Sequence, residues 1–161
     1  TERTFNKDTI DITRLKTTIF AMAENLAFQL RRGNKLACTI AVKIRYSDFN
    51  TYTKQVSIPY SSADHIIIPK VMEFFDKLYE RRLMIRLVGV RFTNLVSGNY
   101  QINLFDDTEE MINLYSAMDT IRNRFGELSV TRASAMGART IGRFHNPFSG
   151  EPPILLAHRQ Q

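Results

Sequence analysis

Residues 36–58 read LACTIAVKIRYSDFNTYTKQVSI, and this stretch decides the fold. Its first half alternates between apolar Ile40, Val42, Ile44 and Tyr46 and the more polar Thr39, Ala41, Lys43, Arg45 and Ser47. That two-residue period is typical of a β-strand with one buried face. Residues 47–50 have turn chemistry, and the alternation resumes over residues 51–58 with Tyr52, Val56 and Ile58 on one face. The stretch therefore predicts a β-hairpin with one apolar and one polar face.

Helical patterns flank this hairpin on both sides. Upstream, residues 12–32 carry apolar side chains at three- and four-residue steps, with Asp11 as the expected N-cap and Gly33 just past the end. Downstream, residues 61–82 contain a second stripe made of Val71, Phe74, Phe75 and Leu78. Pro69 either begins this helix or kinks it.

Two further strands complete the predicted sheet. Residues 3–7 can form a short first strand, and residues 85–93 (IRLVGVRFT) read as the last one, with Val88, Val90 and Phe92 opposite Gly89, Arg91 and Thr93. Arg86 breaks this parity and is expected in the turn before the strand. The order over residues 1–96 is β-α-β-β-α-β, which predicts an α+β fold: a four-stranded sheet with two helices on its apolar face and an open polar face.

The remainder of the chain predicts three smaller segments. Residues 97–107 form a linking loop, and residues 108–126 an additional helix with Thr108 as N-cap. The apolar stripe of this helix is Met111, Leu114, Tyr115, Met118, Ile121 and Phe125, and the helix either packs on the domain or mediates self-association. Residues 127–161 carry prolines without a periodic pattern, which indicates an extended or partly disordered tail.

Composition excludes several classes of protein. The 161 residues include 43% apolar side chains and one cysteine, so neither a disordered chain nor a disulfide scaffold is expected. No apolar run reaches the length of a membrane span, and the single cysteine fits a reducing compartment, the cytoplasm. Residues 1–96 hold 16 basic and 9 acidic side chains. Such an excess is typical of a domain that binds nucleic acid, but an ordinary basic surface in contact with solvent explains it at least as well.

The sequence offers little catalytic chemistry. Its three histidines and one cysteine lack metal-ligand spacing, and no nucleotide-binding fingerprint is present. Asp106, Asp107, Glu109 and Glu110 could in principle bind magnesium, but acidic residues at a helix start are better explained by the helix dipole. We therefore expect the chain itself to be non-catalytic and to hold no cofactor or metal.

The polar face of the predicted sheet indicates how the domain could bind a partner. Lys43, Arg45, Thr51, Thr53, Gln55 and Ser57 share this face, which carries no aromatic ring. Hydroxyls, amides and cations suit phosphate oxygens, whereas readers of single strands stack bases on aromatic rings. The pattern is typical of a domain that binds the backbone of a nucleic-acid duplex without sequence preference. An ordinary solvated sheet face explains the same pattern equally well.

Three stretches carry a resemblance to a known family. They are KIRYSDFNTYTKQ at residues 43–55, IRLVGVRFTNL at 85–95 and QINLFDD at 101–107. Together with TERTF at 1–5 and RFG at 124–126, they resemble the C-terminal part of bacterial Y-family DNA polymerases of the DNA polymerase IV type. The tail GARTIGRFHNPFSGEPP is also similar to the end of such proteins.

The resemblance implies a little-finger domain over residues 1–96 that grips primer–template DNA in the major groove during damage tolerance. Its DNA face would comprise Lys43, Arg45, Thr51, Thr53, Gln55, Arg91 and Arg86, with Glu2 unhelpfully on or near it. The clamp-binding segment would comprise Gln101, Ile102, Asn103, Leu104 and Phe105, of which Gln101 orients while Leu104 and Phe105 fill the pocket of the bacterial sliding clamp.

The resemblance places nucleotide transfer outside these residues. The palm that holds magnesium would belong to the parent polypeptide, whose catalytic core would be a further partner of this domain. The alternative is a module of similar topology, unrelated to polymerases, that binds RNA or a protein.

Overall fold

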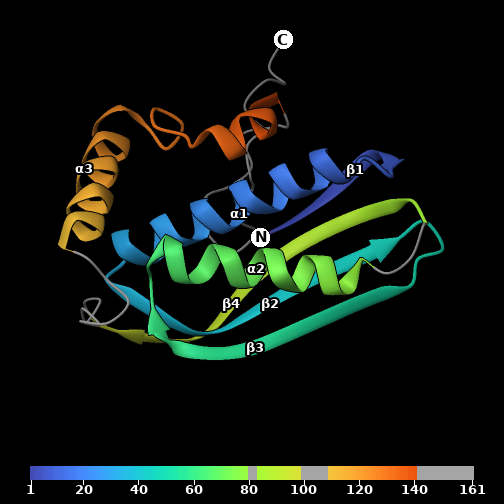
Figure 1. Cartoon of the computed structure of the whole chain (residues 1–161), viewed down its shortest axis with the longest axis horizontal. Helices are drawn as coiled ribbons and strands as arrows, with labels where there is room; N and C mark the ends of the chain where they lie inside the picture. Colours follow the sequence, from blue (N-terminus) through green and yellow to red (C-terminus); the bar gives the residue numbers. More distant parts are fainter. Residues whose placement is uncertain (80–82, 99–108, 141–161) are drawn as a thin grey trace, which may run out of the picture.

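Two helices cover one face of a four-stranded antiparallel sheet in the computed structural model of the chain (Figure 1). The structure describes residues 1–79, 83–98 and 109–140. Its elements in chain order are β1 (Glu2–Thr9), α1 (Ile12–Arg32), β2 (Lys35–Tyr46), β3 (Thr51–Ser61), α2 (Asp64–Leu78), β4 (Ile85–Ser97), α3 (Glu109–Phe125) and the 3₁₀-helix η1 (Ala133–Thr140). The predicted α+β fold and its element order are confirmed.

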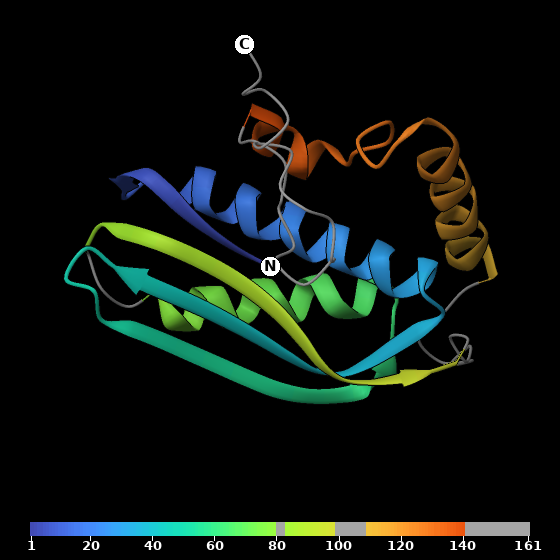
Figure 2. The same ribbon diagram turned by 180° about the vertical axis from the view of Figure 1, so that it is seen from behind.

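The strands lie in the order β1-β4-β2-β3, so the predicted hairpin forms one side of the sheet and β3 is an edge strand (Figure 2). Within the hairpin, Lys43 lies opposite Thr53 and Arg45 opposite Thr51. On the other side of β2, Lys43 lies opposite Gly89 of β4, which in turn lies opposite Glu2 of β1. This register brings residues from all four strands into single rows across the sheet.

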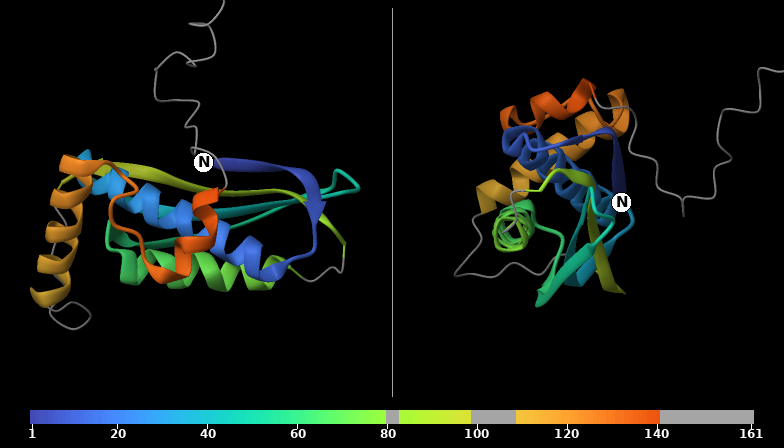
Figure 3. Two further views of the ribbon diagram at one scale, coloured as in Figure 1. Left: turned by 90° about the horizontal axis from the view of Figure 1, so that it is seen from above. Right: turned by 90° about the vertical axis from the view of Figure 1, so that its right-hand side faces the viewer.

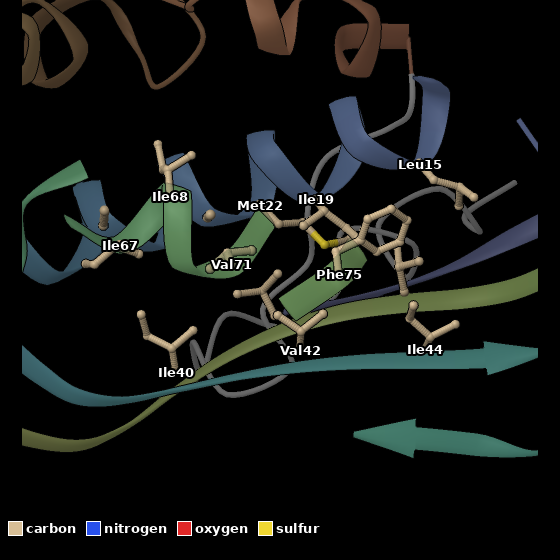
Figure 4. Packing of buried hydrophobic residues seen from close by; sticks show 14 of the residues in the cluster. Leu15, Ile19, Met22, Ile40, Val42, Ile44, Ile67, Ile68, Val71 and Phe75 are labelled. Carbon is tan, nitrogen blue, oxygen red and sulfur yellow. The ribbon is translucent and has the colours of Figure 1, made fainter. Parts of the chain in front are cut away.

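The core lies between the sheet and the two helices. Ile40, Val42 and Ile44 of β2 point toward α1 and α2, as the two-residue period predicts (Figure 4). They meet a helical layer whose fully buried side chains include Leu15, Ile19, Met22, Ile67, Val71 and Phe75. Burying a side chain of this size contributes about 1.5–3 kcal/mol, so this apolar layer fixes which face of the sheet is covered.

The helix ends lie close to the positions that the capping residues of the sequence predict. The Asp11 carboxylate accepts a hydrogen bond from the Arg14 amide at 3.0 Å, which makes Asp11 the N-cap of α1. The Gly33 amide donates to the Gln29 carbonyl at 3.0 Å and closes the helix. Helix α2 begins at Asp64, so Pro69 lies inside this helix and does not begin it.

The start of the last strand, β4, differs from the prediction in the position of Arg86. Arg86 lies within β4 rather than in a preceding turn, because the pairing shifts between Leu87 opposite Arg45 and Ile85 opposite Tyr46. One residue of β2 is thus matched by two of β4, which makes Arg86 the extra residue of a β-bulge. The bulge returns Ile85 to the apolar face, where it is fully buried.

The C-terminal segment also departs from expectation. The stripe predicted for α3 is only partly buried: Tyr115 and Met118 are buried, whereas Leu114, Ile121 and Phe125 are exposed. Residues 133–140, expected to be extended, form η1, which packs along α1 through the buried Ala135 and Ala138 (Figure 1). The small side chains explain the weak apolar signal, because alanine contributes close packing with little hydrophobic pattern.

Buried ion pairs hold α3 and the residues before η1 against the helical layer. The Arg122 guanidinium of α3 pairs with Glu24 of α1 at 2.9 Å, with 4% and 5% of the two side chains exposed. Arg31 of α1 pairs with Asp119 of α3 at 2.6 Å and with Asp64 of α2 at 2.7 Å. Asp64 also accepts from Arg132 at 2.7 Å. Of the two open alternatives for the additional helix, the structure therefore has it packed on the domain.

Arg31 stands at the centre of these pairs. Burial by itself would lower the pKa of its guanidinium, but the hydrogen bonds and charges of Asp119 and Asp64 raise that pKa well above its ordinary value. The side chain also lies over the Tyr115 ring, 5.2 Å from its centroid. Arg31 is therefore a permanently charged link between α1, α2 and α3.

Candidate nucleic-acid interface

The face of the sheet opposite the helices carries mostly polar side chains, of which those on β3 are exposed, whereas Thr39, Ala41 and Leu87 on the same face are buried. Seen along the sheet, α1 and α2 lie on one side of the strands (Figure 3, right). On the other side lie Thr51, Thr53, Gln55 and Ser57, the alternate residues of β3 in the hairpin, and all four are exposed. We call this surface the open face, and define it as the alternate positions 51–57 of β3, 39–45 of β2, 87–93 of β4 and 2–4 of β1.

Three cations follow one another across the open face. Arg91 lies opposite Ala41, and this row is adjacent to the row that contains Lys43. The row of Lys43 is in turn adjacent to the row that contains Arg45. Successive rows are two residues apart, or roughly 6.8 Å at the rise of an extended strand. The three cations therefore span about 14 Å along the sheet, a length over which duplex DNA presents several phosphates.

Neighbouring side chains orient two of these cations. The Arg45 Nε donates a hydrogen bond to the Thr51 hydroxyl at 2.9 Å, which holds the guanidinium against the sheet. The Lys43 Nζ donates to the Glu2 carboxylate at 2.8 Å. Arg91 is exposed on β4. The open face thus presents three cations and one carboxylate.

The edge strand adds neutral polar groups beside the cations. Thr51, Thr53 and Gln55 are all exposed, and each lies directly opposite a residue of β2 in the cation rows. The alternate positions 51–57, 39–45 and 87–93 hold no aromatic residue. Hydroxyls, an amide and cations can donate to phosphate oxygens, but this surface offers no ring on which a base could stack.

Arg86 lies apart from the other candidate DNA-binding residues. Because it occupies the bulge, its guanidinium is stacked on the Phe49 ring, 4.8 Å from the centroid, at the hairpin turn. Its Nη1 also lies 3.8 Å from the Asp8 carboxylate. The structure thus brings six of the seven candidates, Lys43, Arg45, Thr51, Thr53, Gln55 and Arg91, onto the open face and places Arg86 at its end.

Other expected sites lie outside the described residues. The candidate clamp-binding segment, Gln101, Ile102, Asn103, Leu104 and Phe105, belongs to the range 99–108, as do Asp106, Asp107 and the expected N-cap Thr108. Over residues 1–79, 83–98 and 109–140, no group of three or more His, Cys, Asp or Glu side chains could hold a metal ion. Among the helices in these ranges, none has the length and apolar character to cross a membrane.

Comparison with known proteins identifies the family. Residues 1–104 match the family described as the impB/mucB/samB family C-terminal domain, and the chain belongs to this family. In Y-family DNA polymerases this C-terminal domain is the little finger, which confirms the resemblance seen in the sequence.

Named relatives agree with this assignment. The chain is 32% identical over 136 residues to DNA polymerase IV of Clostridium acetobutylicum, covering 82% of this chain and 34% of the relative. It is 41% identical over 95 residues to DNA polymerase IV of Streptococcus pyogenes serotype M3, covering 58% of this chain and 26% of the relative. The chain thus spans about a third or less of the length of these relatives.

Two solved structures that are similar to the chain are polymerase structures, and the first of them shares its fold. A post-insertion binary complex of Dbh DNA polymerase matches with a TM-score of 0.50 at 16% identity, over 60% of this chain and 28% of that one. A complex of the beta-clamp processivity factor with the little finger domain of PolIV matches with a TM-score of 0.48 at 22% identity, over 66% of this chain and 96% of that one.

Proposed function

We propose that the open face grips the sugar–phosphate backbone of duplex primer–template DNA for a translesion polymerase of which this chain is the C-terminal part. The observation that carries this proposal is that Arg91, Lys43 and Arg45 occupy successive rows of the open face, where Arg91 is exposed and Lys43 and Arg45 are half-buried. The three cations neutralise phosphates, and Thr51, Thr53 and Gln55 donate further hydrogen bonds. Such contacts fix the position of the duplex and carry no sequence information, which suits a polymerase that must accept damaged templates.

Family membership decides between the two alternatives drawn from the sequence. A module of similar topology unrelated to polymerases is not compatible with a match over residues 1–104 to the impB/mucB/samB C-terminal domain. We therefore assign nucleotide transfer, its magnesium and the catalytic core to the rest of the parent polypeptide. The domain would serve that core by holding the duplex beside it.

We further propose that residues 101–105 dock on the bacterial sliding clamp. The segment lies between two elements that the structure places, since β4 ends at Ser97 and α3 begins at Glu109. Leu104 and Phe105 would together contribute about 3–6 kcal/mol on burial, before ordering costs are subtracted. Micromolar affinity requires about 8 kcal/mol, so the remaining contacts of the segment, that of Gln101 among them, must supply the rest. The clamp would then act by tethering, because it raises the effective concentration of the polymerase at the primer end.

The experiment that tests the DNA-binding proposal is a salt titration of binding to labelled duplexes, read by fluorescence anisotropy. Three to five phosphate contacts predict a slope of about −3 to −5 in log affinity against log salt. The double variant Lys43→Ala/Arg45→Ala should weaken binding to all sequences alike and flatten the slope by about one unit per lost contact.

A matched control separates the open face from the total charge. Lys70→Ala/Lys77→Ala removes the same charge from α2, where both side chains are about half exposed. This control variant should bind the duplexes with nearly the same affinity as the unaltered chain. An affinity independent of salt, a single preferred sequence, a preference for single strands, or equal losses in the two double variants would contradict the proposal.

A further inference from the structure

An ion pair on the open face joins two strands that are not neighbours. Glu2 belongs to β1 and Lys43 to β2, and β4 lies between them. Adjacent strands are about 4.8 Å apart, so the two backbones are separated by roughly 9.6 Å. The Glu2 carboxylate nevertheless reaches the Lys43 ammonium at 2.8 Å.

Gly89 makes this contact possible. It is the β4 residue between Glu2 and Lys43 in the row, and it contributes no side chain. A Cβ at this position would lie 2.9 Å from Glu2 Cγ and 3.5 Å from Glu2 Cβ, so an alanine would displace the Glu2 side chain. A glycine inside a strand commonly marks a close approach of another group, and here that group is the side chain of Glu2.

The pair involves Lys43, the middle one of the three cations on the open face. Lys43 lies between Arg91 and Arg45 in the succession of rows, so a phosphate bound there would have to share its ammonium with a carboxylate or displace it. Both partners are accessible, with 31% of the Lys43 side chain and 51% of the Glu2 side chain exposed. An exposed ion pair of this kind is weak, so DNA can displace it.

We propose that Glu2 is an internal competitor of the DNA phosphate at Lys43, which lowers the affinity of the domain for duplex and keeps its grip reversible. This inference rests on the proposed function and adds a residue that sets the strength of binding. Glu2 acts through Lys43, and Gly89 supplies the space that lets it do so. A domain that must move along a duplex during synthesis gains from a grip that is readily released.

The test compares Glu2→Gln with Glu73→Gln by anisotropy on the same duplex. Both substitutions remove one exposed carboxylate, but Glu73 lies on α2 and pairs with Lys70 and Lys77. Glu2→Gln should raise affinity about 1.5- to 5-fold, the range spanned by one exposed ion pair, and should steepen the salt slope by up to about 0.9. Glu73→Gln should leave both nearly unchanged.

Two further variants show whether the effect passes through Lys43. Glu2→Gln added to Lys43→Ala should give no further gain, because the competition no longer exists. Gly89→Ala should reproduce the gain of Glu2→Gln, and the Lys43 ammonium resonance should shift in Glu2→Gln even without DNA. The shift gives a readout of the pair that does not depend on binding.

The outcomes distinguish this inference from the proposal on which it rests. If Lys43→Ala weakens binding but Glu2→Gln behaves as Glu73→Gln does, Glu2 is not a competitor and the proposed function stands. If Glu2→Gln raises affinity equally in the Lys43→Ala background, Glu2 only repels DNA at a distance and the inference is wrong. If Lys43→Ala has no effect on binding, the proposed function itself fails.

Discussion

Asp64→Asn is expected to destabilise the domain strongly although the substitution changes one atom. The Asp64 side chain is 1% exposed, and each of its carboxylate oxygens accepts a hydrogen bond at 2.7 Å, one from Arg31 and one from Arg132. An asparagine can accept at one of these positions, but its amide nitrogen then faces a guanidinium donor at the other. The substitution also removes a negative charge from between two partly buried cations.

The structure sets the size of the effect. Breaking a buried ion pair by removing one partner costs about 3–5 kcal/mol. Here the two arginines keep a second carboxylate each, since Arg31 also pairs with Asp119 and Arg132 lies 3.5 Å from Glu24. We therefore expect a loss of about 3 kcal/mol, at the lower end of that range. For a domain of this length that corresponds to a fall in Tm of about 6–12 °C.

The assay is urea and thermal unfolding followed by circular dichroism, with Asp76→Asn as control. Asp76 lies on the same helix, is 55% exposed and pairs with Lys16 at 2.7 Å, so its loss should cost no more than about 1 kcal/mol. Amide hydrogen exchange should also quicken in α3, because Asp64 and Asp119 share Arg31. Equal stabilities for the two variants would refute the reasoning that buried ion pairs hold the C-terminal segment in place.

Three other predictions concern the remaining parts of the chain. Leu104→Ala/Phe105→Ala should abolish binding to the sliding clamp in surface plasmon resonance while leaving duplex affinity and Tm nearly unchanged; unfolding of the domain by several kcal/mol would instead mean that both side chains belong to the core. Burial, with a further contribution from Asp64, raises the pKa of the Tyr115 hydroxyl above its ordinary value of 10.0, so its stabilising contribution is complete below pH 10 and is lost as pH rises through the folded-state pKa. The stability advantage over Tyr115→Phe should therefore shrink in this alkaline range, and a constant difference would contradict the assignment. The purified 161-residue chain should not extend a primer with magnesium or manganese, and extension that Asp106→Ala abolishes would overturn the assignment of catalysis to the rest of the polypeptide.

Local sequence signals were sufficient for the main elements of the fold. The alternation around Ile40 and Val42, the cap at Asp11 and the glycine at residue 33 each act within a few residues, and each agrees with the structure. The same alternation placed Lys43, Arg45 and four polar side chains of β3 on one face, because successive residues of a strand point to opposite sides.

Features that depend on distant partners could not be predicted in this way. Arg86 occupies a bulge because of how β4 pairs with β2, which the residues around it do not reveal. Arg122 is buried although most of α3 is polar, because its guanidinium donates a hydrogen bond to the Glu24 carboxylate, 98 residues earlier in the chain. The Glu2–Lys43 pair likewise requires that β1 lie beside β4 and that Gly89 leave a gap, although the position of Glu2 near the open face was visible from the sequence.

The most direct test of the central claim is to map the contact surface by NMR as duplex DNA is added to the chain at low salt. Binding of DNA through the open face predicts that amide and side-chain shifts concentrate there, at Thr51, Thr53 and Gln55 of β3, Lys43 and Arg45 of β2 and Arg91 of β4. It also predicts that the shifts fade as salt is raised and are alike for duplexes of different sequence. Shifts concentrated instead on α1, α2 or α3, with the open face unchanged, would contradict the account.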